Sequence, residues 1–260
     1  MLFDKSQEIN GVDVHYKVVG QGPAVLVLHG WGRGSVSYVE VMEALAQQRY
    51  QVITPDLPGF GKTPPPKTPW GVDEYAQFAF QFAQKLTLGK FYLLGHSFGG
   101  QIAVKLATEH PELVQKLILY GAAVLRREPG SKIKAMQAVA RMGNSVLSIP
   151  PFSILKRPMR KAFYRLFGLG SAAYSQGIMK EIRGKIVRQD LSHLLPGISL
   201  PVLILWGDKD RSTPLGDAYL IKGKIPHASL VVFRGATHLI HREVPEEFVY
   251  HVAKFCSEKQ

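Results

Sequence analysis

Short apolar runs alternate along the chain with longer stretches in which apolar residues recur every three or four positions. Runs of the first kind are typical of strands buried on both faces of a parallel sheet, and the longer stretches are typical of helices with one buried face. The alternation therefore predicts an α/β fold in which helices flank a mostly parallel sheet. The predicted strands of this sheet are residues 24–28, 52–54, 91–94, 116–120, 202–206 and 229–233.

Turn and capping signals surround these strands. Asn10-Gly11, between two alternating runs, predicts a hairpin over residues 8–16. Asp73 is expected to cap the helix whose apolar face lies within residues 75–86, and Pro245 is expected to begin the last helix. Further helices are predicted around residues 39–46, over residues 101–110 and after Pro214.

Residues 126–188 interrupt the alternation. They contain no clear strand and several helix-like stretches, and they hold 14 of the 32 Lys and Arg residues but two of the 20 Asp and Glu residues. The whole net charge of +12 lies in this segment, because the remaining chain holds 18 basic and 18 acidic residues. We expect a core domain formed by residues 1–125 and 189–260, and a small, basic helical cap formed by residues 126–188.

The sequence Gly95-His96-Ser97-Phe98-Gly99 stands between a predicted strand and a predicted helix. It matches the G-x-S-x-G pattern, in which a sharp turn lifts a serine hydroxyl above the sheet. Small neighbours leave room for the strained backbone of such a turn, and the following helix presents N–H groups to developing negative charge. Ser97 is therefore the predicted nucleophile.

A serine hydroxyl needs a base that takes its proton and an acid that orients the base. In chains with this pattern an Asp or Glu follows the serine, and a His follows the acid. Asp210, in the loop after the strand at 202–206, is the predicted acid. Asp208 is the alternative, although its place at the strand end favours a role in capping the turn.

His238 is the predicted base, because it follows the last predicted strand and so lies at the edge of the sheet where ligands collect. The other histidines are assigned structural roles. His227 and His241 are expected to be surface or loop residues, and His96 is expected to pack beside the nucleophile.

Two main-chain N–H groups are expected to bind the negative charge of the tetrahedral intermediate. Phe98 supplies one, and Trp31, in the loop after the strand at 24–28, is assigned the other. A glycine-rich phosphate cradle is the alternative for this loop, but neither a Lys-Ser/Thr ending nor G-x-G-x-x-G follows. We expect neither a cofactor nor a metal ion in this chemistry.

Together these segments resemble the α/β-hydrolase superfamily, across essentially the whole chain. The resemblance implies the α/β-hydrolase fold, a Ser–Asp–His triad and a helical cap inserted after the sixth strand. A serine nucleophile separates the chain from dehalogenase-like and epoxide-hydrolase-like members, which carry Asp there, and places it near carboxylesterases and C–C hydrolases. The matching segments are His29-Gly30-Trp31-Gly32, Asp56-Leu57-Pro58-Gly59-Phe60-Gly61, Gly95 to Gly100, Gly207-Asp208-Lys209-Asp210 and Gly235 to His238.

The leading hypothesis for function is carboxylic ester hydrolysis through an acyl-enzyme on Ser97, as in carboxylesterase-like serine hydrolases. The resemblance leaves a second reaction open, the hydrolytic cleavage of a C–C bond in a diketone-type compound by the same triad. A third hypothesis is a ligand-binding member of the fold without catalysis, and a complete set of triad residues counts against it.

The basic residues of the predicted cap have three interpretations: a solvated surface, a site that attracts anionic substrates, or weak contact with a membrane surface through residues 159–167. The expected partner is a small-molecule ester, with an anionic ester as one alternative. Nucleic acid is not expected, because no recognition fold accompanies the charge.

The first residues of the chain lack the basic segment, apolar stretch and cleavage site of a secretory signal. No apolar run approaches the roughly 20 residues of a membrane-spanning helix. Cys256 is the single cysteine, so no internal disulfide can form. We therefore expect a cytoplasmic protein.

Overall fold

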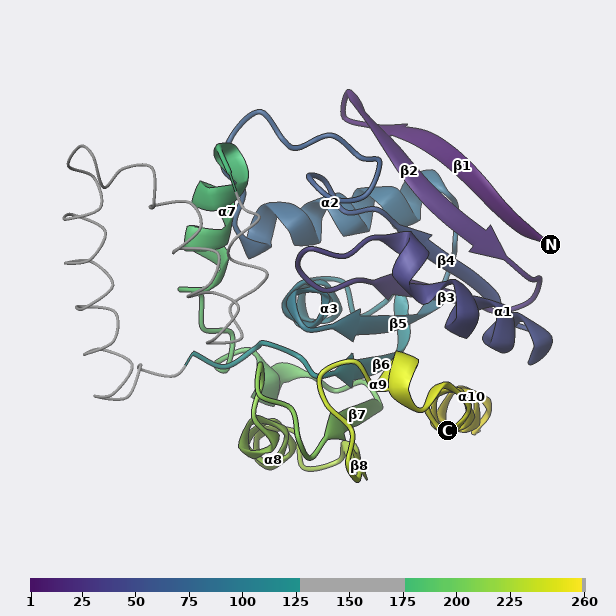
Figure 1. Cartoon of the computed structure of the whole chain (residues 1–260), viewed down its shortest axis with the longest axis vertical. Coiled ribbons are helices and arrows are strands. Elements are labelled where there is room, and N and C mark those ends of the chain that lie inside the picture. Colours follow the sequence, from purple (N-terminus) through teal and green to yellow (C-terminus); the bar gives the residue numbers. More distant parts are fainter. Residues whose placement is uncertain (127–175, 259–260) are drawn as a thin grey trace, which may run out of the picture. The chain divides into compact units, whose positions relative to one another are not determined.

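A mostly parallel sheet forms the centre of the computed structural model, which describes residues 1–126 and 176–258 (Figure 1). The strands are β1 (Leu2–Ile9), β2 (Val12–Val19), β3 (Ala24–Leu28), β4 (Gln51–Pro55), β5 (Phe91–His96), β6 (Val114–Tyr120), β7 (Val202–Gly207) and β8 (Ser229–Phe233). They lie in the order β1-β2-β4-β3-β5-β6-β7-β8. The hairpin β1–β2 and the pair β2–β4 are antiparallel, and every other pair is parallel. The predicted α/β fold with a mostly parallel sheet is confirmed.

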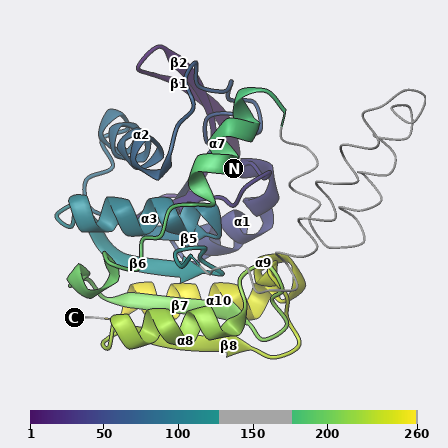
Figure 2. The same ribbon diagram turned by 90° about the vertical axis from the view of Figure 1, so that its left-hand side faces the viewer.

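Helices cover both faces of the sheet. Figure 1 shows α1 (Val39–Gln47) and α10 (Pro245–Ser257) on one face, and α2 (Val72–Lys85), α3 (Phe98–Glu109) and α8 (Leu215–Lys224) on the other. Figure 2 gives the same arrangement from the side, with α3 and α8 in front of the strands and α10 behind. The remaining described helices are α7 (Ile178–Ile186), α9 (Ile240–Glu243) and the 3-10 helices η1 (Ser35–Tyr38) and η3 (Leu195–Gly197).

The apolar runs form the core because the central strands are buried on both faces. Every residue of β3, β5 and β7 is buried, as the continuous apolar runs predict. Alternate residues of these strands and of β6 pack against α1 and α10, because side chains two positions apart share a face of a strand. This part of the core includes Val25, Val27, Leu94, Ile118, Leu203, Leu205, Met42, Leu45, Phe248 and Val252.

Two helices begin earlier than the sequence predicts. The first turn of α2 contains Asp73, and Gly71 takes the capping position instead. Glu74 accepts the N–H of Gly71 at 2.6 Å, so a carboxylate three residues downstream supplies the cap expected from Asp73. Helix α3 begins at Phe98 rather than near residue 101, because the turn at Ser97 leads directly into the helix.

Hydrogen bonds join the chain segment just before residue 127 to the segment just after residue 189. The N–H of Leu191 donates to the carbonyl of Val124 at 3.0 Å, and the N–H of Arg126 donates to the carboxylate of Asp190 at 2.6 Å. Residues Met1–Arg126 and Glu181–Gln260 form one compact unit, and Arg127–Lys180 form a second. Most of the predicted cap, at 126–188, lies outside the described residues, so its boundaries stay a prediction.

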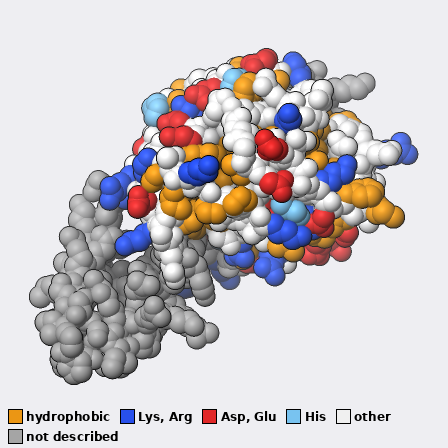
Figure 3. Space-filling view, turned by 90° about the horizontal axis from the view of Figure 1, so that it is seen from above, with side chains coloured by type: hydrophobic (Ala, Val, Ile, Leu, Met, Phe, Trp, Pro, Cys, Tyr) orange, Lys and Arg blue, Asp and Glu red, His pale blue; other side chains and the backbone are white. Residues whose placement is uncertain are grey.

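Charges on the described surface are mixed in sign. On the face in Figure 3, basic and acidic side chains of the described residues are interspersed. Several form ion pairs, as in Lys17 with Asp4 at 2.8 Å and Lys105 with Asp73 at 2.9 Å. Within residues 1–126 and 176–258, no helix combines the length and the apolar character that crossing a membrane requires.

A buried lysine joins the centre of the sheet to the end of the last helix. Lys116 in β6 is 4% exposed, and its Nζ donates to the carbonyls of Phe255 at 2.6 Å and Glu258 at 2.7 Å. The last carbonyls of a helix lack partners within it and carry partial negative charge. The Lys116 ammonium therefore caps α10 from the sheet.

We expect Lys116→Met to lower the free energy of unfolding by about 2 kcal/mol, because two buried carbonyls lose a charged donor. Urea unfolding measures the change. Lys90→Met is the control at an exposed position, with an expected change within about 0.5 kcal/mol. Equal effects of the two substitutions would show that Lys116 does not act as a cap.

Candidate active site

Ser97 lies in a strained turn between β5 and α3. Its φ of 53° and ψ of −112° fall in a region that residues other than glycine rarely adopt. The N–H of Ser97 donates to the carbonyl of Tyr120 at 3.0 Å, and its carbonyl accepts the N–H of Ala123 at 3.0 Å. The end of β6 therefore holds the strained residue in place.

The glycine at position 99 makes this turn possible. A Cβ at Gly99 would lie 2.0 Å from the carbonyl oxygen of Leu28, at the end of β3. Any larger residue would push α3 away from the sheet, because real Cβ atoms do not approach a backbone so closely. Gly99 thereby brings the start of α3 against the loop that follows β3.

Asp210 and His238 form a direct pair. The two loops that carry them follow neighbouring parallel strands, β7 and β8, and Asp210 Oδ2 lies 2.6 Å from His238 Nδ1. The Asp210 side chain is 1% exposed, whereas that of His238 is 19% exposed. Burial alone would raise the pKa of Asp210, but the hydrogen bond and charge of His238, with donors from Thr213, outweigh it and lower that pKa. An ionised Asp210 accepts the Nδ1–H and leaves Nε2 of His238 able to take a proton.

Thr213 fixes the carboxylate of Asp210. Its N–H donates to Asp210 Oδ1 at 2.9 Å, and its hydroxyl lies 2.8 Å from Oδ2 and 3.3 Å from Nδ1 of His238. Trp206 in β7 holds the loop itself, since its indole N–H donates to the carbonyl of Thr213 at 2.7 Å. Sequence reasoning missed Thr213, although an Asp followed by Ser and Thr two and three positions on is a signal for such a side-chain turn.

Ser97 and His238 each lie next to the end of β6. The carbonyl of Tyr120 binds the N–H of Ser97, and the next residue, Gly121, faces the base. A Cβ at Gly121 would lie 3.2 Å from Nδ1 and Cε1 of His238. The rings of His238 and His96, the residue before the nucleophile, are 4.8 Å apart. The structure therefore brings all three predicted triad residues to one end of the sheet.

The loop after β3 contacts the nucleophile. A Cβ at Gly30 would lie 3.3 Å from Cβ of Ser97. The rings of Trp31 and Phe98 meet edge to face at 5.6 Å, so the two predicted oxyanion donors belong to neighbouring residues in space. Phe98 is the first residue of α3, and its N–H therefore has no acceptor within the helix.

His29 ties this loop to the loop after β4. Its Nδ1 lies 2.9 Å from the carbonyl of Gly30, and its Nε2 lies 3.0 Å from the N–H of Leu57. Burial lowers the pKa of His29 to about 4. The ring is therefore neutral, with Nδ1 donating to Gly30 and Nε2 accepting from Leu57.

Asp56 holds the same two loops together through its carboxylate. It accepts the N–H groups of Ser35 at 2.6 Å and Lys62 at 2.9 Å, and Nδ1 of His15 lies 2.8 Å away. Burial alone would raise the pKa of Asp56, but these hydrogen bonds outweigh it and lower that pKa. The sequence indicates a family resemblance for the motif that begins at Asp56, but it does not predict this role of the carboxylate.

In the structure His238 pairs with Asp210 and not with Asp208, the alternative acid. Asp208 is exposed and accepts the N–H of Gly235 at 2.8 Å, as expected for a residue that caps the turn. The expectation for His241 is wrong, because it is 2% exposed in α9 and its Nδ1 lies 2.7 Å from the hydroxyl of Tyr120. His227 is exposed in a turn and His96 is buried, as expected.

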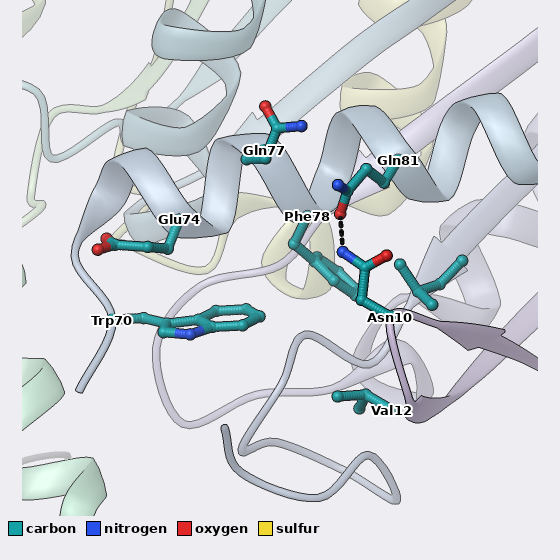
Figure 4. Close-up of a pocket in the computed structure, with 8 residues that line it drawn as sticks. Asn10, Val12, Trp70, Glu74, Gln77, Phe78 and Gln81 are labelled. Carbon is teal, nitrogen blue, oxygen red and sulfur yellow. Dashed lines mark hydrogen bonds between the residues drawn. The ribbon is translucent and has the colours of Figure 1, made fainter. Parts of the chain in front are cut away.

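A pocket of about 230 Å³ lies elsewhere, between the β1–β2 hairpin and α2 (Figure 4). Figure 4 shows Asn10 of the hairpin and Gln81 of α2 pointing toward each other, joined by a 2.6 Å hydrogen bond. The lining residues are Ile9, Asn10, Val12, Trp70, Glu74, Gln77, Phe78 and Gln81. No predicted catalytic residue lines this pocket. Among the described residues, no cluster of His, Cys, Asp and Glu is suited to hold a metal ion.

Comparison with known proteins gives the family. A family model described as the alpha/beta hydrolase fold matches residues 23–147. The chain belongs to the α/β-hydrolase superfamily. It is 25% identical to the structure of an esterase from Exiguobacterium antarcticum, with a TM-score of 0.75 over 97% of this chain and 98% of that one.

Two curated relatives of this α/β hydrolase differ in reaction. A pimeloyl-[acyl-carrier protein] methyl ester esterase of Nitrosomonas europaea is 29% identical over 91% of this chain and 96% of its own length. A 2-hydroxy-6-oxononadienedioate/2-hydroxy-6-oxononatrienedioate hydrolase of Pseudomonas sp is 27% identical over 96% and 93%. Both relatives are hydrolases by name. The comparison therefore supports hydrolysis but does not show which kind of bond is cleaved.

We expect Asp210→Asn to reduce kcat by about 10³-fold or more, because the amide cannot hold His238 in the required tautomer. Asp208→Asn is the matched control on the same loop and should stay within about threefold of wild type. Steady-state kinetics on an activated ester compares the two. A severe loss in Asp208→Asn with a mild one in Asp210→Asn would reverse the assignment of the acid.

The lowered pKa of Asp56 predicts a pH-dependent contribution to stability. The ionised carboxylate contributes fully above the unfolded pKa of about 4, and the contribution is lost as the pH falls through the lower folded pKa. We expect Asp56→Asn to lose about 1–3 kcal/mol at pH 7 and to show a shallower decline of stability below about pH 4. Denaturant unfolding across pH measures this, with the exposed Asp13→Asn as the control. Parallel pH profiles for wild type and Asp56→Asn would contradict the prediction.

Proposed function

We propose that this α/β hydrolase is a serine hydrolase that cleaves carboxylic esters through an acyl-enzyme on Ser97. One observation carries the proposal. The 2.6 Å pair of Asp210 and His238 lies at the end of β6, where the strained backbone of Ser97 is also held. An ionised carboxylate, an oriented imidazole and a serine at the start of a helix are the groups that acyl transfer needs.

In the proposed first half of the reaction, Oγ of Ser97 attacks the ester carbonyl while Nε2 of His238 takes the hydroxyl proton. Asp210 accepts the Nδ1–H throughout and stabilises the imidazolium that forms. The main-chain N–H groups of Phe98 and Trp31 bind the developing oxyanion. His238 then gives the proton to the departing alcohol, which leaves an ester between the acyl group and Ser97.

In the second half, water attacks the acyl-enzyme while His238 takes one of its protons. Collapse of the second tetrahedral intermediate returns that proton to Oγ of Ser97 and releases the carboxylic acid. The only co-reactant is water, and Asp210 stays ionised.

The proposed substrate is a small-molecule ester. The esterase of Nitrosomonas europaea and the esterase structure from Exiguobacterium antarcticum support ester cleavage. The 14 basic residues between Arg126 and Arg188 favour an anionic ester over a neutral one of the same size, because they would raise the local concentration of anions.

Hydrolysis of a C–C bond is the second candidate. Similarity to the Pseudomonas hydrolase over 96% of this chain favours it. A diketone-type substrate and p-nitrophenyl esters of increasing chain length, assayed side by side, separate the two reactions. Turnover of the diketone with kcat/KM well above that of every ester would replace the ester proposal with this one.

We expect Ser97→Ala to reduce kcat by about 10⁴-fold or more while the fold stays intact, and His238→Ala to be comparably severe. Hydrolysis of p-nitrophenyl esters measures the loss, and circular dichroism checks the fold. Mass spectrometry after fluorophosphonate treatment tests whether Ser97 carries the label. An unlabelled Ser97 in a folded wild-type protein would favour the third hypothesis, a ligand-binding protein without catalysis.

A further inference from the structure

A connected group of four buried polar rings reaches the main chain of His238, and none of the four belongs to the proposed triad. They are Tyr38 at the end of η1, His96 in β5, Tyr120 in β6 and His241 in α9, each between 0% and 2% exposed. The rings of His96 and Tyr120 stack at 4.1 Å, and those of Tyr38 and His241 stack at 4.6 Å. Polar groups buried so completely are costly unless each has a hydrogen-bond partner.

Two of these rings bind the carbonyl oxygen of His238. The hydroxyl of Tyr120 lies 2.7 Å from it, and Nε2 of His96 lies 3.1 Å from it. A carbonyl oxygen has two lone pairs, so both donors fit at once. His238 is thus held at its side chain by Asp210 and at its main chain by β5 and β6.

The proton arrangement on His96 is fixed by its neighbours. Its Nε2 faces a carbonyl, which only accepts, and therefore carries the proton. Its Nδ1 then accepts from the hydroxyl of Tyr38, which lies 2.6 Å away. Burial holds the pKa of His96 well below its usual value, so the ring stays neutral with this tautomer.

The second donor depends on His241. Its Nδ1 lies 2.7 Å from the Tyr120 hydroxyl, and its Nε2 lies 3.2 Å from the carbonyl of Ser37. Burial lowers the pKa of His241 to about 4, so the ring carries one N–H at neutral pH. Three contacts, from Ser37 through His241 and Tyr120 to His238, then share two protons. Nε2 of His241 faces a carbonyl, which only accepts, and therefore carries the ring proton, as in His96. The single hydroxyl proton of Tyr120 is then shared between Nδ1 of His241 and the carbonyl of His238, both 2.7 Å away.

The position of His238 in the sheet explains why its main chain needs such support. It lies in the turn between β8 and α9, and β8 is an edge strand with β7 as its single neighbour. A shift of this turn would move Nε2 relative to Ser97, and misplacement by about 1 Å can cost about 100-fold in rate. Tyr120 and His96 come from central strands, each of which is paired with a strand on both sides.

We propose that Tyr120 and His96 are positioning residues for the base: their two hydrogen bonds to the carbonyl of His238 hold its imidazole against Ser97. The inference rests on the proposed function, since it assigns His238 to that reaction. It adds two residues that touch neither the substrate nor the reacting atoms.

The first test compares Tyr120→Phe with a matched control. Tyr120→Phe keeps the stacked ring and removes one donor. Tyr92→Phe removes the same kind of buried bond, from Tyr92 to the carbonyl of Cys256 at 2.9 Å, at the start of β5 and so at the end of that strand opposite to His96. We expect the second-order rate of fluorophosphonate labelling at Ser97 to fall about five- to tenfold in Tyr120→Phe and to stay at the wild-type rate in Tyr92→Phe. On an ester substrate, kcat should fall and KM should not change.

The second test uses both donors. His96→Gln keeps an N–H donor near the place of Nε2, and His96→Leu does not. We expect His96→Gln to be labelled within about threefold of the wild-type rate, and His96→Leu about tenfold more slowly. Because either donor alone still holds the carbonyl, Tyr120→Phe with His96→Leu should lose more than the product of the single effects.

Proton NMR supplies a readout that a general loss of stability would not move. The Nδ1 proton that His238 shares with Asp210 should shift or broaden in Tyr120→Phe and stay unchanged in Tyr92→Phe. Equal labelling rates in wild type, Tyr120→Phe and Tyr92→Phe, with an unchanged proton resonance, would overturn the positioning role alone. Absence of labelling in the wild-type protein would overturn the proposed function and the positioning role together.

Discussion

The close approach of α3 to the end of β3 is the constraint on which the candidate site depends. A side chain at position 99 would overlap the carbonyl of Leu28, so the helix can reach this place with glycine alone. Once it does, the residue before the helix must turn sharply, and Ser97 adopts a left-handed backbone. The same contact sets the loop after β3 beside the serine. The predicted nucleophile and the predicted oxyanion loop are therefore both positioned by the contact between α3 and the end of β3.

The other half of the site is built differently, from loops at the edge of the sheet. Asp210 and His238 follow the last two strands, and the edge strand β8, which leads to His238, has β7 alone to restrain its backbone. Buried hydrogen bonds take over this task, from Trp206 and Thr213 on the acid and from Tyr120 and His96 on the base. Tyr120, the last residue of β6, binds the main chain of both Ser97 and His238. One central strand therefore helps to fix the distance between the nucleophile and the base.

Much of the fold followed from the sequence because its signals are local. Apolar runs gave the central strands nearly residue by residue, and Asn10-Gly11 gave the hairpin. The start of α2 was misplaced because a glycine capped by Glu74 competes with the more familiar Asp73. His241 was assigned to the surface because nothing in its own neighbourhood in the sequence shows that Tyr120, 121 residues earlier, will bind it.

The triad candidates could be named from strand ends and chain order, and the structure brings them together. Their supporting residues could not be named with the same ease. Thr213 had a local signal in its spacing from Asp210, whereas Tyr120 looked like one more apolar residue of a buried strand. Contacts between side chains that are distant in the sequence depend on how helices and strands pack, and one amino-acid sequence does not show that packing.

The two hydrogen bonds at the base of residues 127–189 have a consequence for how this chain can diversify. Val124 with Leu191, and Arg126 with Asp190, join the chain segment that follows β6 to the segment that leads toward β7. Because the two ends of an insertion here are bonded to each other, its length can change without altering the register of β6 and β7. This point of the chain is therefore one where insertions and deletions can be tolerated.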